Sequence, residues 1–162
     1  MPKNALLSYL LRQTQLCNYQ QLDEVVQVFG LTPSQYIVLS VVDEHRDGVF
    51  SSALARRLGV TPQSCHEIVT GLEQRGLIRR VEDAAYRRML RVSLTAKGGT
   101  LLNKCNKDVE RFEARFFGGL SAAETTAFRT MLTRIIRDSR ENSATDSLEA
   151  PAPRTRAVAA AR

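Results

Sequence analysis

Two short helices joined by a tight turn are predicted by residues 51–76, which read SSALARRLGVTPQSCHEIVTGLEQRG. We expect the first helix to begin at Ser51, whose hydroxyl can accept an unpaired backbone N–H, and to end at Gly59, which tolerates a left-handed exit. Thr61 is a favourable N-cap for the second helix, and Pro62 suits its first turn. Gly76 then ends it. This arrangement predicts a helix-turn-helix.

The spacing of apolar residues assigns the two faces of the second helix, at about 61–75. The stripe expected to be buried recurs every three or four residues: Cys65, Ile68, Val69 and Leu72. The opposite face is polar and carries Gln63, Ser64, His66, Glu67 and Thr70. Such side chains can meet base edges or phosphates when a helix lies in a major groove. We therefore interpret this segment as a recognition helix.

After Gly76 the spacing of apolar residues changes from the period of a helix to the two-residue period of a strand. Apolar residues at 90, 92 and 94 alternate with polar ones and predict a half-buried strand, while residues 79–81 supply a partner strand. The tip between them ends in Arg87 and Arg88, which suit a phosphate backbone or a narrow minor groove. The predicted fold is mainly α, a winged helix-turn-helix over 31–98 with a small β-hairpin wing at about 79–94.

Positive charge is concentrated in this module. Residues 50–98 hold nine Lys and Arg against four Asp and Glu, a net charge of +5 out of +6 for the whole chain. A localised excess favours binding to double-stranded DNA over a general solubility role. The candidate DNA-contacting residues are Ser51, Thr61, Gln63, Ser64, His66, Glu67, Thr70, Arg79, Arg87, Arg88 and Arg91. Two alternatives remain open: a merely solvated basic surface, and a winged helix that binds another protein.

Helices predicted on both sides of this lobe favour a homodimer. We expect one helix within residues 1–30 and two within residues 99–141. The first of these two bears an apolar seam of Leu101, Cys105, Val109, Phe112 and Phe116, and the second begins with a capping box at Ser121–Glu124. Between them, a capping box at Thr32–Gln35 begins a core helix that runs to about Glu44 and bears Tyr36, Ile37, Leu39, Val41 and Val42. So long a seam outside the lobe suggests packing against a second copy, which would present two recognition helices to a pseudo-palindrome.

The remaining segments predict little chemistry. From 142 to 162 the chain is rich in Ser, Ala, Pro and Arg without periodicity, and we expect a disordered tail. No signal peptide or apolar run long enough for a membrane span is visible, so a cytoplasmic location without membrane contact is expected. No nucleophile with its base, paired carboxylates or phosphate loop points to an enzyme, and no metal or cofactor is expected.

The ordered motifs of residues 5–140 resemble the MarR (multiple antibiotic resistance regulator) family of winged-helix transcription factors. The similarity lies in LTPSQY (31–36), SALARRLGV (52–60), GLEQRGLIRR (71–80), the paired arginines at 87–88 and VSLTAKG (92–98). The resemblance implies a homodimeric repressor that is released by a small molecule, an anionic aromatic compound in many members. It places the effector near the first, second and fifth helices, where Tyr9, Arg12, Tyr36 and His45 are candidates.

Two departures from the family pattern bear on the DNA that is read. Tyr86 stands where the family usually has an aspartate before the wing arginines. If that aspartate orients an arginine, as the resemblance implies, the orienting salt bridge is missing in this chain. Glu67 stands where an arginine is frequent in the recognition helix. A carboxylate accepts from cytosine N4 but repels phosphate, so we expect a different operator from the common one.

The three cysteines, at 17, 65 and 105, form neither a disulfide framework nor a metal site. Cys65 and Cys105 fall on apolar stripes and are interpreted as small hydrophobic residues. Cys17 lies on the first helix, where peroxide-sensing members of the family carry a reactive cysteine. A redox-sensing repressor is therefore the alternative function within the same family.

Overall fold

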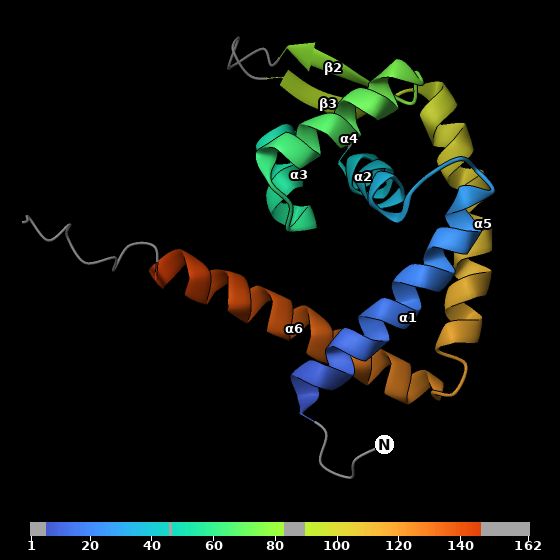
Figure 1. The fold of residues 1–162 in the computed structure, drawn as a ribbon, viewed down its shortest axis with the longest axis vertical. Helices are drawn as coiled ribbons and strands as arrows, with labels where there is room; N and C mark the ends of the chain where they lie inside the picture. Colours follow the sequence, from blue (N-terminus) through green and yellow to red (C-terminus); the bar gives the residue numbers. More distant parts are fainter. Residues whose placement is uncertain (1–5, 46, 83–89, 147–162) are drawn as a thin grey trace, which may run out of the picture. The chain divides into compact units, whose positions relative to one another are not determined.

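The computed structural model describes residues 6–45, 47–82 and 90–146 and divides into two units, Met1–Phe116 and Phe117–Arg162. The first unit (Figure 1) contains the helices α1 (Leu7–Gln27), α2 (Pro33–Glu44), α3 (Ser51–Leu58), α4 (Pro62–Gln74) and α5 (Ala96–Phe116), and the strands β1 (Val49–Phe50), β2 (Ile78–Glu82) and β3 (Leu90–Leu94). The second unit contains α6 (Ala122–Asp146). This is the predicted winged helix-turn-helix with flanking helices.

The three strands form one antiparallel sheet in the order β1-β3-β2. The β2–β3 pair is the predicted hairpin, with Ile78 opposite Leu94 and Glu82 opposite Leu90. Strand β1 was not predicted, because two residues are too few to show an alternation. It pairs with the other edge of β3 and sets Phe50 opposite Arg91.

Local capping explains where the helices begin and end. The capping box predicted for α2 is present. The backbone N–H of Gln35 donates to Thr32 Oγ1 at 3.2 Å, and the backbone N–H of Thr32 donates to Gln35 Oε1 at 3.1 Å. Thr61 caps α4 as expected, with Pro62 in the first turn. Gly59 closes α3 with a positive φ of 67°. Helix α3 begins at Ser51 as predicted, but the capping role expected of Ser51 was wrong, because Phe50 occupies the N-cap position and no side-chain hydrogen bond caps this helix.

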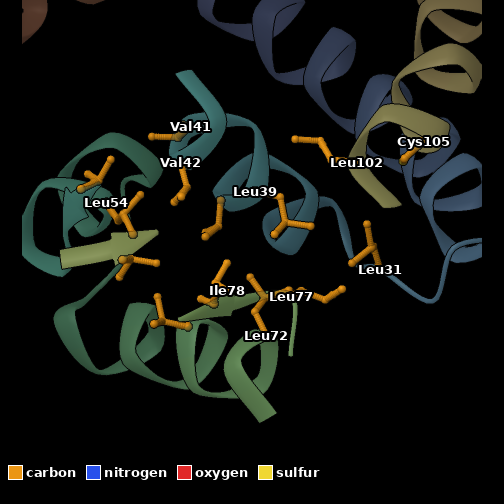
Figure 2. Packing of buried hydrophobic residues seen from close by; sticks show 14 of the residues in the cluster. Leu31, Leu39, Val41, Val42, Leu54, Leu72, Leu77, Ile78, Leu102 and Cys105 are labelled. Atoms are coloured by element: carbon orange, nitrogen blue, oxygen red, sulfur yellow. The ribbon is translucent and has the colours of Figure 1, made fainter. Parts of the chain in front are cut away.

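The core of the lobe lies between α2, α3, α4 and the sheet. Figure 2 shows Leu39, Leu54, Leu72 and Ile78 pointing toward a common centre. Ile37 was wrongly expected in this core: it is 41% exposed, whereas Val38 beside it is buried. Close packing of these side chains fixes the position of α4 against the rest of the lobe.

Three of the five seam residues of α5 are buried within the chain, and Leu101 and Phe116 are half-buried. Cys105, Val109 and Phe112 have little exposed surface, and α1 lies alongside α5 (Figure 1). The inference that this seam needs a second copy was therefore wrong. Large apolar residues are instead exposed on α1 and on α6: Leu7, Tyr9, Leu10, Leu11, Leu16 and Tyr19 on α1, and Met131, Ile135 and Ile136 on α6.

Helix α6 begins with the predicted capping box. The Glu124 amide donates to Ser121 Oγ at 3.3 Å, and the Ser121 amide donates to Glu124 Oε2 at 2.8 Å. The helix continues to Asp146, past residue 142 at which an irregular tail was expected to begin. The rest of that tail, 147–162, lies outside the described residues. Within the described ranges, no helix combines the length and apolarity needed to cross a membrane.

Candidate nucleic-acid interface

The outward face of α4 presents polar side chains on a rigid support. Cys65, Val69 and Leu72 are buried beneath the helix, and this stripe sets its rotation. Gln63, His66 and Glu67 are exposed on the opposite side, as predicted. The Gln63 amide lies 3.4 Å from Glu67 Oε1 and donates to it. These groups offer donors and acceptors of the kind that read base edges.

Two hydroxyls lie at the start of α4. Thr61 is exposed and its Oγ1 accepts the Ser64 backbone N–H at 3.1 Å, while the half-buried Ser64 places its hydroxyl 2.9 Å from the same oxygen. The N-terminus of a helix carries partial positive charge and unpaired N–H groups, which favour a phosphate. The position therefore suits contact with a DNA backbone.

Thr70 faces the sheet rather than open solvent. It is half-buried, and its Oγ1 accepts from Arg80 Nη2 at 2.7 Å. Arg80 also donates its backbone N–H to Glu73 Oε1 at 3.0 Å and places Nε 3.5 Å from Glu73 Oε2. These contacts tie the recognition helix to β2, so Thr70 supports the helix in addition to any contact with DNA.

The arginines at the base of the wing are placed differently. Arg79 is exposed on β2. Arg91 is half-buried, with its guanidinium carbon 4.4 Å from the centre of the Phe50 ring and Nη1 3.3 Å from the Gly48 carbonyl, to which it donates. A cation held over a ring face loses mobility, so β1 fixes the direction of Arg91. Arg87 and Arg88 lie outside the described residues.

Ser51 joins the two helices of the motif. It is half-buried, and its carbonyl accepts from the Cys65 thiol at 3.5 Å. Burial raises the pKa of Cys65 above its ordinary value. Ser51 thus helps to hold α3 against α4.

The four residues nominated for an effector are spread along two helices. Tyr9 and Arg12 are exposed on α1, and His45 is exposed at the end of α2 with Nδ1 2.8 Å from the Val41 carbonyl. Tyr36 is half-buried, its hydroxyl donates to Asn106 Oδ1 at 3.1 Å, and burial raises its pKa. Among the described residues no hydrogen bond or ring contact joins any two of these four.

The cysteines fall into two environments. Cys17 is exposed on α1, whereas Cys65 and Cys105 are buried and all three are free thiols. Burial, with a smaller contribution from Asp108, raises the pKa of Cys105 to about 11. The interpretation of Cys65 and Cys105 as core residues agrees with this burial.

Two arginines that organise the site were not singled out from sequence. Arg80 was detectable in principle, because the two-residue period of a strand places it on the same face as buried Ile78. Arg75, at the end of α4, donates to the Gly30 carbonyl at 2.7 Å and to the Phe29 carbonyl at 3.4 Å. No local pattern predicts that contact, because it joins segments more than 40 residues apart.

Comparison with known proteins agrees with this geometry. A sequence profile of the MarR family matches residues 29–89. The putative transcriptional regulatory protein for the hcr operon of Thauera aromatica is 30% identical over 139 residues, which cover 85% of this chain and 83% of that protein. The chain belongs to the MarR family. Family membership makes it a winged helix-turn-helix regulator of transcription.

Solved structures of MarR family regulators share the fold. The repressor CouR bound to a 23-mer DNA duplex is 31% identical, with a TM-score of 0.74 and coverage of 81% of this chain and 92% of that one. CouR of Rhodococcus jostii RHA1 was also solved with p-coumaroyl-CoA. The Mycobacterium tuberculosis family member Rv2887, solved with salicylic acid, is 27% identical with a TM-score of 0.67 and coverage of 83% and 99%.

Proposed function

We propose that this MarR family chain is a homodimeric repressor that binds a pseudo-palindromic operator and is released by a small ligand. The observation that carries the proposal is the exposed polar face of α4, with Gln63, His66 and Glu67 held outward by the buried stripe beneath them. The DNA complex of CouR supports a role in binding duplex DNA. In this proposal α4 enters the major groove, and Thr61, Ser64, Arg79, Arg87, Arg88 and Arg91 meet the backbone.

The dimer is supported by unpaired apolar surface. Leu7 is 79% exposed, and Ile135 and Ile136 are each 51% exposed. Apolar helix faces of this kind are usually covered in an oligomer. A two-fold dimer presents its two α4 helices to two half-sites, which is the reason for expecting a pseudo-palindrome.

The effector half of the proposal is supported by relatives. Rv2887 was solved with salicylic acid and CouR with p-coumaroyl-CoA, and both ligands carry an acidic group and an aromatic ring. Tyr9, Arg12, Tyr36 and His45 are the candidate contacts. A ligand releases DNA only when it binds better to the form of the dimer whose recognition helices are wrongly spaced.

A redox-sensing repressor is the second candidate, favoured by the exposure of Cys17 on α1. In that case a hydroperoxide releases the protein from DNA, and Cys17→Ser abolishes the release while Cys105→Ser does not. Release by hydroperoxide that persists in Cys17→Ser would remove this candidate.

The experiment for the DNA-binding proposal compares residues on one helix. Gln63→Ala and His66→Ala should each weaken binding to the operator by about fivefold to a hundredfold, because a base contact contributes about 1–3 kcal/mol. Gln74→Ala, at the exposed end of the same helix, should change affinity by less than about twofold. Equal affinity of all three variants for the operator would contradict the assignment of α4 as the recognition helix and would favour the alternative that this winged helix binds another protein.

A further inference from the structure

One side chain joins the carboxyl end of α4 to the turn between α1 and α2. Arg75 directly follows α4 and is half-buried. Its Nη1 donates to the Gly30 carbonyl at 2.7 Å and to Gln35 Oε1 at 3.5 Å, and its Nη2 donates to the Phe29 carbonyl at 3.4 Å. A single guanidinium therefore binds three oxygens, two on the turn and one in the first turn of α2.

These acceptors suit an arginine in particular. Phe29 and Gly30 follow the last turn of α1, where the ends of the peptide groups carry partial negative charge. Gln35 Oε1 already accepts the backbone N–H of Thr32 in the capping box of α2, so its position is fixed. A guanidinium is planar and offers several donors in fixed directions, whereas the ammonium of lysine is a single point of charge. Arg75→Lys therefore keeps the charge but loses the simultaneous contacts.

The start of α5 holds the same end of α4. The backbone carbonyl of Arg75 accepts from Lys97 Nζ at 2.7 Å, and the next carbonyl, of Gly76, accepts from Thr95 Oγ1 at 2.8 Å. Thr95 directly precedes α5, and Lys97 is the second residue of that helix. The end of α4 is therefore bonded to two other segments, and the Arg75 guanidinium supplies the bonds to the α1–α2 turn.

Arg75 lies far from the residues expected to meet base edges. Helix α4 has 13 residues, so about 20 Å of helix axis separate Arg75 from the first turn. A change of about 3° in the direction of the helix moves one end relative to the other by about 1 Å, which exceeds the spread of about 0.5 Å in hydrogen-bond distances. Base contacts depend on such distances, whereas attraction to phosphates does not require them.

We propose that Arg75 is a positioning residue for operator recognition, which sets the direction of α4 through the α1–α2 turn and does not itself touch DNA. The proposal rests on the proposed role of α4 as the recognition helix. Arg75 complements Arg80, which ties the same helix to β2. Loss of the Arg75 contacts should therefore lower affinity for the operator more than affinity for other DNA.

The test measures the affinity of each full-length variant for two duplexes of equal length, one from the DNA that flanks the protein's own gene and one of random sequence. The readout is the ratio of the two affinities, because a loss of folded protein lowers both equally and leaves the ratio unchanged. Arg75→Lys should lower the ratio by about threefold to tenfold, and Arg75→Ala by at least as much. Affinity of Arg75→Lys for random DNA should change by less than about twofold.

Arg111→Lys is the matched control. Arg111 donates to the Lys107 carbonyl at 3.3 Å and pairs with Asp108 at 2.9 Å, and both partners belong to its own helix, α5. The contacts of Arg111 join no second element, so this substitution should change the ratio by less than about twofold.

A salt series separates positioning from direct contact with DNA. Arg75→Ala should leave the slope of log affinity against log salt within about half a unit of that of the unaltered protein, because a residue that touches no phosphate releases no counterion. A slope reduced by about one unit would overturn the proposal and would make Arg75 a phosphate contact.

An unchanged ratio in Arg75→Lys would also overturn the proposal, and so would an equal loss of affinity for both duplexes in either Arg75 variant. A ratio near one for the unaltered protein would contradict the role of α4 itself, and with it this proposal. A high ratio that the Arg75 variants retain would overturn the role of Arg75 alone, so the two failures are distinguishable.

Discussion

The neighbouring arginines Arg79 and Arg80 on β2 have different surroundings, so their replacement should change the stability of the protein by different amounts. The Arg80 side chain donates to Thr70 Oγ1 and places Nε 3.5 Å from Glu73 Oε2, whereas its backbone N–H donates to Glu73 Oε1. Arg80→Ala keeps the backbone bond but leaves the half-buried Thr70 hydroxyl without its donor, and should lower the free energy of unfolding by about 1–2 kcal/mol. Arg79 is exposed, and Arg79→Ala should change stability by less than about 0.5 kcal/mol. Urea denaturation measures both, and equal losses would contradict the role given to Arg80.

The same pair separates stability from DNA binding. If Arg79 meets a phosphate, Arg79→Ala weakens binding to all sequences alike and reduces the slope of log affinity against log salt by about one unit. An unchanged salt slope would remove Arg79 from the candidate contacts.

Thiol reactivity at the three cysteines should follow burial. Exposed Cys17 should react with Ellman's reagent in the folded protein, whereas Cys65 and Cys105 should react only after unfolding. The folded pKa of Cys105, about 11, lies above the ordinary value of 9.0, so its contribution to stability is complete below pH 9.0 and is lost as the pH rises toward 11. Cys105→Ala should reduce the loss of unfolding free energy at alkaline pH. An unchanged loss in this variant would contradict the raised pKa of Cys105.

The start of α5 depends on one glycine. A Cβ at Gly98 would collide with the Leu77 carbonyl, so Gly98→Ala should destabilise the protein by about 2 kcal/mol or more. Gly99 is the control on the same turn, since its Cβ would lie 3.6 Å from Leu94 Cδ2, an ordinary contact. Gly99→Ala should be neutral or stabilising by less than about 1 kcal/mol. Thermal unfolding distinguishes them, and similar melting temperatures would contradict the close approach.

The capping box of α6 should respond to acid. Hydrogen bonds from the Ser121 backbone and then from its hydroxyl lower the pKa of Glu124 below 4.5. Since the folded pKa is depressed, this stabilisation is present above pH 4.5 and is lost as the pH falls through the folded value. Ser121→Ala should raise the pKa of Glu124 only part of the way back to its ordinary value, because the backbone N–H of residue 121 still donates to the carboxylate. Carboxyl NMR titration measures it, and an unchanged pKa would exclude the hydroxyl contribution.

Elements specified by neighbouring residues were predictable from the sequence. Both capping boxes, at Thr32–Gln35 and Ser121–Glu124, and the Thr61 cap depend on contacts three residues apart, so composition and spacing reveal them. Strand β1 was missed because its two residues gain their structure from pairing with β3. The periodicity of α5 correctly marked an apolar face, but periodicity does not say which surface covers it, and α1 does so within the chain.

The candidate site was predictable to the same degree. Spacing alone placed Gln63, His66 and Glu67 on the exposed face of α4. The supports of that face, Arg80 beneath Thr70 and Arg91 over Phe50, depend on contacts between separate elements and required the three-dimensional structure.

The proposed homodimer is a property of the whole molecule and should depend on exposed apolar residues of α1 and α6. Leu10→Arg and Ile135→Arg should each shift the protein toward monomers, because a charge in a packed interface is costly. Val81→Arg is the control, since Val81 is an exposed apolar residue on the wing strand. Light scattering coupled to size-exclusion chromatography gives the mass, and an unchanged dimer in both helix variants would contradict these interfaces.

The most direct test measures binding of the purified protein to the DNA that flanks its own gene. Random DNA serves as competitor, and the measurement is repeated across a salt series. We predict a specific complex with two chains per duplex, whose log affinity falls linearly with log salt by about 0.9 for each phosphate contacted. Equal affinity for random DNA, or no binding at low salt, would contradict the assignment of α4 as a recognition helix.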